Sequence, residues 1–190
     1  MKRVAVAAVL GGLAMFVWGA VSHMLTPLGE AGMRSMPPAG EPAVTGALSA
    51  NVPDDGMYMF PGMDERARNT DEGREEWMRR YAAGPAGLLI YHPHGGKTMN
   101  SQLLGTELLT NILAVAVAAW TATHARTFGR RLLLVTAFGL AAWLSIEASY
   151  WNWYGFPTNY ALAQLIDQVV GFFFAGLVVA RIVRPAPAAA

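Results

Sequence analysis

The sequence predicts an all-α integral membrane protein: a bundle of four transmembrane helices with a small mixed α/β extracytoplasmic cap between the first two. Two observations predict this fold class. Of the 190 residues 54% are hydrophobic and only 14% are charged, and the charges are crowded between Glu30 and Lys97. Outside that region lie four stretches almost free of charge, each with the roughly 20 apolar residues that a helix needs to cross a bilayer.

The four predicted spans have similar lengths and similar ends. Tryptophan and tyrosine, which favour the membrane–water interface, lie at or near these ends, as Trp18, Trp120, Trp151 and Tyr160 illustrate. The predicted spans are residues 4–22, 103–123, 132–150 and 160–183.

The distribution of basic residues predicts the orientation of the helices. With four spans, all the lysines and arginines that flank them fall on one side of the membrane, which the positive-inside rule makes cytoplasmic. These residues are Lys2, Arg3, Arg126, Arg130, Arg131, Arg181 and Arg184. Both termini are then cytoplasmic, residues 23–102 are extracytoplasmic, and residues 184–190, rich in proline and alanine, form a disordered cytoplasmic tail. We expect the membrane to be a bacterial inner membrane.

The N-terminus has a second interpretation. A basic start followed by an apolar run also begins a secretory signal peptide, and Ala20 to Ser22 could serve as a cleavage site between small residues. Three spans would then remain. The long apolar run and the bulky Phe16 and Trp18 beside the cleavage position favour an uncleaved first helix.

The segment of residues 23–102 is too long for a simple turn and predicts a small ordered cap. Residues 41–51 are expected to form a short helix, and Asn69 is expected to cap a helix that runs through Arg80. The stretches "DGMYMFPG" and "GLLIYHP" are expected to form two strands. If these strands pair, His92 and His94 lie where the second strand breaks at Pro93.

Polar side chains within the spans are the first candidate site. A charge in hydrocarbon is costly, so such residues usually pair or face a cavity. By helix rise all three intramembrane carboxylates fall in the outer half of the bilayer, and two amides and a histidine lie near them. The predicted polar pocket comprises His23, Glu107, Asn111, Glu147, Gln164 and Asp167. The alternative is that these groups hydrogen-bond between helices and hold the bundle together.

A metal site is the second candidate. His92 and His94 provide two imidazoles, which His23, Glu107 or Glu147 could supplement to bind zinc or copper. Eight of the ten methionines lie in or beside the external segment, where thioethers could share a Cu(I) ion. The alternative is that the methionines fill a small irregular core.

Several function classes lack their residues in this sequence. There are no cysteines, the net charge is only +1 with no basic run for nucleic acid, and no G-x-S-x-G motif occurs. Small residues four apart, such as Ala8 and Gly12, or Gly171 and Ala175, favour close helix packing within the chain or against another protein. We therefore expect a non-catalytic component of a larger membrane assembly, with the lipid bilayer and other subunits or a second copy as partners. The alternative is a transport, metal-handling or proton-linked function of the polar pocket.

Overall fold

A computed structural model describes residues 1–184 of the chain. The chain divides into two compact units. The helical unit comprises Met1–Arg34 and Met99–Ala190, and the intervening unit comprises Ser35–Thr98.

The helical unit contains the four long helices that the sequence predicts. They are α1 (Lys2–Leu25), α5 (Ser101–Ala122), the continuous helical segment formed by α6 (Phe128–Ala142), the π-helical turn η2 (Trp143–Glu147) and α7 (Ala148–Tyr154), and α8 (Thr158–Ile182). Each of these four segments is long and apolar enough to cross a membrane. A short 3-10 turn, η1 (Pro27–Glu30), follows α1. The prediction of four membrane-spanning helices is therefore supported within residues 1–184.

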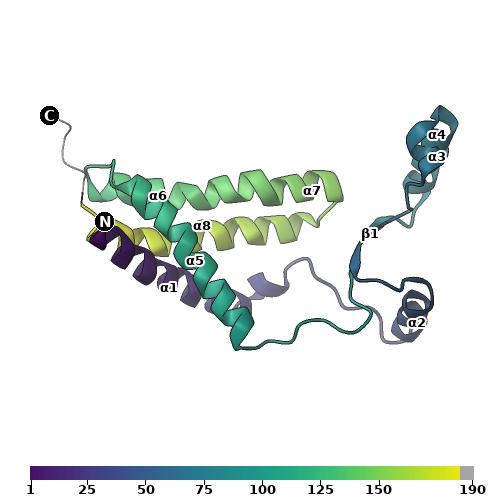
Figure 1. The fold of residues 1–190 in the computed structure, drawn as a ribbon, viewed down its shortest axis with the longest axis horizontal. Coiled ribbons are helices and arrows are strands. Elements are labelled where there is room, and N and C mark those ends of the chain that lie inside the picture. Colours follow the sequence, from purple (N-terminus) through teal and green to yellow (C-terminus); the bar gives the residue numbers. More distant parts are fainter. Residues whose placement is uncertain (185–190) are drawn as a thin grey trace. The chain divides into compact units, whose positions relative to one another are not determined.

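The four helices pack in a row rather than in a closed ring. Helix α8 lies between α6 and α1, and α1 lies between α8 and α5. Helix α5 crosses the others obliquely, so that its N-terminal end lies apart from them (Figure 1). The buried residues of α5 begin at Asn111 and continue to Ala122, whereas the turns before Asn111 have no buried residue.

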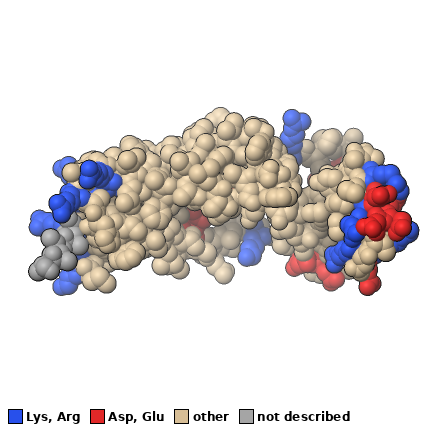
Figure 2. Space-filling view, turned by 90° about the horizontal axis from the view of Figure 1, so that it is seen from above, with Lys and Arg blue, Asp and Glu red and all other residues tan. Residues whose placement is uncertain are grey.

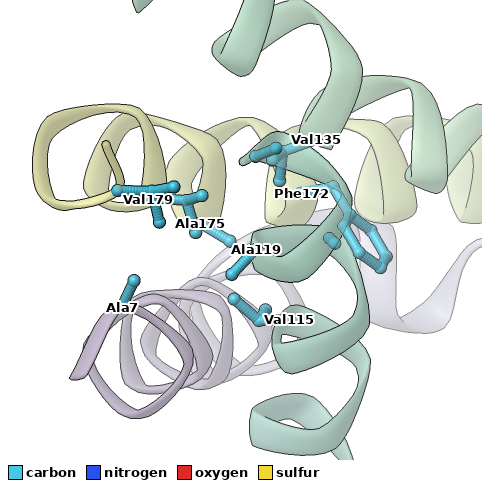
Figure 3. Close-up of a cluster of buried hydrophobic side chains, with 10 residues drawn as sticks. Ala7, Val115, Ala119, Val135, Phe172, Ala175 and Val179 are labelled. Carbon is cyan, nitrogen blue, oxygen red and sulfur yellow. The ribbon is translucent and has the colours of Figure 1, made fainter. Parts of the chain in front are cut away.

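Small side chains allow the four helices to approach one another closely at one end of the helical unit, where α5 packs against its neighbours; this end is called the packed end. Ala7 of α1, Val115 of α5 and Val135 of α6 come together there with Ala175 and Val179 of α8 (Figure 3). These side chains form a hydrophobic core that all four long helices share.

The predicted small-residue faces are used inside this chain. A Cβ atom added at Gly12 would lie 2.6 Å from Ile112 Cα, and one added at Gly11 would lie 2.8 Å from a methyl carbon of Val115. Gly139 of α6 similarly faces the backbone of Gln168 in α8. Because glycine alone fits these contacts, the small residues serve internal helix packing.

Basic residues gather at the packed end of the helical unit. The N-terminus of α1, the connection from α5 to α6 and the C-terminus of α8 meet there (Figure 1). The Arg131 guanidinium donates a hydrogen bond to the Val183 carbonyl, which ties the start of α6 to the end of α8. Figure 2 shows lysine and arginine at this end and a long surface with few charges beyond it.

The intervening unit is a small α/β structure. It contains α2 (Glu41–Asn51), β1 (Gly56–Phe60), α3 (Glu65–Asn69), α4 (Asp71–Ala83) and β2 (Gly87–Tyr91). The two strands pair antiparallel, with Gly56 opposite Tyr91 and Phe60 opposite Gly87. The Trp77 indole of α4 donates a hydrogen bond to the Pro61 carbonyl at 3.0 Å, which attaches the helix to the end of β1. The predicted strand pair and the predicted helix over 41–51 are present.

One sequence prediction differs from the structure in this region. Asn69 does not cap a helix: it ends α3, and Thr70 caps α4 by accepting a hydrogen bond from the Gly73 amide at 3.0 Å. Helix α1 continues one turn past Ser22, the end of the first predicted span, to Leu25, and the intervening unit starts at Ser35, while the bounds of the external segment stay a prediction. The Thr26 hydroxyl, which bonds the Ser22 carbonyl at 2.7 Å and caps η1, holds the extra turn in place. Of the predicted tail, residues 185–190 lie outside the described residues.

A polar cavity in the helical unit

A cavity of about 580 Å³ opens between α1, α5 and α8, where α5 diverges from its neighbours. Apolar side chains make up most of its lining, including Met15, Phe16, Trp18 and Leu104. Five polar side chains complete the wall, and they are His23, Glu107, Asn111, Asp167 and Gln168.

Helix periodicity brings these polar groups together. Glu107 and Asn111 are four residues apart on α5 and therefore share a face. Asp167 and Gln168 lie in the third turn of α8, and His23 lies in the last turn of α1. Three helices thus contribute polar groups to one end of the unit, opposite the end where the basic residues gather.

Asp167 is a largely buried carboxylate of the cavity wall. Its side chain is only 17% exposed, and its Oδ2 atom lies 3.7 Å from His23 Nε2. Its Oδ1 atom is buried and has no hydrogen-bond partner among the described residues. The Trp18 indole donates a hydrogen bond at 3.1 Å to the Asp167 main-chain carbonyl, which holds this part of α8 against α1.

The electrostatic character of the cavity is acidic. Two carboxylates, Glu107 and Asp167, line it, and neither a lysine nor an arginine does. His23 is half exposed and is the one lining group that could carry a positive charge. The two carboxylates and the amide oxygens of Asn111 and Gln168 can accept hydrogen bonds, so the cavity favours a guest that is cationic or donates hydrogen bonds.

Comparison with known proteins gives no information on the function of the cavity. No protein-family model matches the sequence, and no curated protein or solved structure matches it either.

Four of the six residues predicted for the polar pocket line the cavity, and they are His23, Glu107, Asn111 and Asp167. Glu147 and Gln164 are not among its lining residues. Glu147 lies in η2, which packs against α8 on the side of α6. Gln164 lies one turn nearer the N-terminus of α8 than the lining residue Gln168. Sequence reasoning missed Gln168. Its signal was its position four residues after Gln164, one turn deeper on the same helix face.

The residues predicted to bind metal lie in the intervening unit and are exposed. His92 Nδ1 lies 3.2 Å from Asp55 Oδ1 across the sheet, and His94 is exposed beyond the strand. Within residues 1–184 no group of three or more histidine, aspartate or glutamate side chains is arranged to hold a metal ion. Met57 and Met59 are 65% and 46% exposed, so they do not fill a core. A copper or zinc site stays a prediction without a preformed ligand cluster.

Proposed function

We propose that this chain is a small integral membrane protein that acts as a non-catalytic component of a larger membrane assembly. The observation that carries the proposal is the unpacked N-terminal half of α5. Residues 104–107 are all exposed, and this includes the polar Thr106 and Glu107 as well as the apolar Leu104. Lipid would cover the leucine, but a carboxylate in hydrocarbon costs about 2.5–3.5 kcal/mol or more. A polar contact from another subunit would offset that cost.

The proposal includes an orientation. Because the basic residues gather at one end of the helical unit, the positive-inside rule favours a cytoplasmic position for that end and for both termini. The polar cavity would then open toward the outer side of a bacterial inner membrane, and the intervening unit would be extracytoplasmic. Labelling of a cysteine introduced at Ala39 by a membrane-impermeant reagent in intact cells tests this orientation, because a cytoplasmic cysteine stays unlabelled.

Native mass spectrometry of the protein, extracted gently from its own membranes, tests the assembly. We expect the mass of at least one further subunit or of a second copy. Leu109→Ala, at a leucine of α5 that is 55% exposed, should lower the fraction of complex, whereas Leu133→Ala, at a leucine of α6 that is 71% exposed, should leave it unchanged. A chain that is always recovered alone contradicts the proposal.

The cavity supports a second candidate function, which is transport, metal-handling or proton-linked activity at the polar site. The specific observation that favours it is a partly exposed carboxylate, Asp167, that lines the cavity. A group that only joined helices would be expected to find a donor on a neighbouring helix. Asp167 instead lines a space large enough for a small molecule.

A further inference from the structure

We propose that the polar cavity binds a primary ammonium group and that Asp167 is its counter-ion. The inference rests on the second proposed function, namely that the cavity holds a ligand at all, and it names the chemical class of that ligand. The ammonium group is the head of an amphipathic guest whose apolar part occupies the rest of the cavity.

Charge is the first step toward this assignment. The cavity is lined by two carboxylates and by no lysine or arginine, so an anion would find no positive partner other than His23. His23 lies 3.7 Å from Oδ2 of Asp167, and any positive charge on it is already opposed by that oxygen. The net preference of the site is therefore for a cation.

Hydrogen bonding narrows the cation to one that carries N–H donors. The cavity wall carries several hydrogen-bond acceptors, and a quaternary ammonium has no N–H to donate to them. A primary ammonium has three donors, which the Asp167 carboxylate and the side-chain carbonyls of Asn111 and Gln168 can accept. The Glu107 carboxylate adds a second negative group to the same wall.

The apolar lining determines the rest of the guest. Met15, Phe16 and Leu104 line the cavity around its polar wall, and a volume of about 580 Å³ lies within the range of small-molecule sites, roughly 300–1,000 Å³. A hydrated metal ion would leave these apolar surfaces unmatched. An alkylammonium matches both parts, with its head at the carboxylates and its chain along the apolar side chains.

Isothermal titration calorimetry on the full chain in phosphatidylcholine nanodiscs tests the assignment, with empty nanodiscs as the blank. The probes are n-hexylammonium, 1-hexanol, hexanoate and hexyltrimethylammonium, which share a hexyl chain and differ in the head. We expect n-hexylammonium to bind most tightly. Because hydrogen bonds to charged groups contribute about 1.5–3 kcal/mol, Asp167→Asn should weaken its binding roughly ten- to hundredfold.

Glu147→Gln is the matched control, because it removes another intramembrane carboxylate that does not line the cavity. It should leave n-hexylammonium binding unchanged. Ala20→Phe gives a second variant in case Asp167→Asn does not fold, because it fills the cavity from an exposed position of α1 and keeps every polar group. It should abolish binding of the same probe.

The failures of the two ideas are distinguishable. If 1-hexanol or hexyltrimethylammonium binds as tightly as n-hexylammonium, the ammonium assignment is wrong while the cavity remains a binding site. If no probe binds beyond the blank, the ammonium assignment is overturned and the cavity is not a site for alkyl guests, whereas metal or proton binding at its carboxylates is a separate question that these probes do not address. Equal binding to the Asp167→Asn and Glu147→Gln proteins also overturns the assignment.

The ammonium could come from a soluble amine or from the headgroup of phosphatidylethanolamine. Repeating the titration in nanodiscs that contain this lipid separates the two sources. Weaker apparent binding of n-hexylammonium there identifies the lipid headgroup as a competitor for the same site, and unchanged binding identifies a soluble amine as the guest. Both results support a primary ammonium at Asp167.

Discussion

The crossing of α1 and α5 at Gly12 is the contact whose perturbation tests the helix arrangement most directly. A Cβ atom at position 12 would lie 2.6 Å from Ile112 Cα and 2.8 Å from Ile112 N, so the obstacle is backbone that no rotamer change can move. To restore a contact of 3.4 Å the helices must separate by about 0.8 Å. A gap of that size forfeits roughly a quarter to a half of the dispersion attraction of the neighbouring atoms.

We therefore expect Gly12→Ala to destabilise the helical unit. Overpacking of this kind costs about 1–3 kcal/mol, whereas alanine gains about 1 kcal/mol over glycine in helix propensity. Gly19→Ala isolates the two effects, because Gly19 lies in the same helix and has no atom within 4 Å of its added Cβ. The Gly12→Ala protein should be about 1–3 kcal/mol less stable than the Gly19→Ala protein in SDS titrations from mixed micelles. Equal stability of the two variants would refute the close α1–α5 crossing.

Three further predictions concern contacts away from the cavity. Arg131→Gln should speed amide hydrogen exchange in the last turn of α8, because the Val183 carbonyl loses its donor, and the exposed Arg130→Gln should not. Thr70→Ala should destabilise the start of α4 by about 1 kcal/mol and raise hydrogen exchange at Gly73, whereas Asn69→Ala should have little effect. Arg79 donates a hydrogen bond to Glu76 and holds the pKa of that carboxyl below its ordinary value. The ion pair of Glu76 with Arg79 therefore stabilises the folded state slightly at any pH above the ordinary pKa of a glutamate. This small stabilisation is lost as the pH falls through the lowered pKa of Glu76 in the folded protein. Arg79→Gln should raise the pKa of Glu76 in an NMR titration, and Arg74→Gln should not.

The long helices and the strand pair were predictable because local sequence determines them. A run of apolar residues has few alternatives to a membrane helix, and the Gly and Pro residues that flank the two strands mark their ends. The cap of α4 was placed one residue too early. Asn69 and Thr70 are adjacent and both suit an N-cap, but Asp64 caps a short helix, α3, that Asn69 ends. The end of α3 at Asn69 therefore determines that Thr70, and not Asn69, caps α4.

The membership of the polar site was predictable only in part. The depth of a residue along its helix follows from helix rise, which brought His23, Glu107 and Asp167 to the same end of the unit. The rotation of each helix about its own axis and the order of helices in the row depend on packing between distant segments. These two features determine that Gln168 lines the cavity and that Glu147 does not.

The side chains that α1 presents to its neighbours change in size near the place where the cavity opens. Its first half presents Ala7, Gly11 and Gly12 to the other helices, and this lets the backbones of α1 and α5 touch at Ile112. One turn later α1 presents Met15 and Trp18, which occupy the space next to Gly171 of α8.

The part of α5 before Asn111 has no buried residue and diverges from its neighbours (Figure 1), and Met15 and Trp18 line the cavity that opens there. The polar groups of the cavity lie beyond this divergence, and the hydrophobic core lies before it. The divergence of α5 leaves Glu107 and Asp167 in the wall of a space that a guest or a partner can enter.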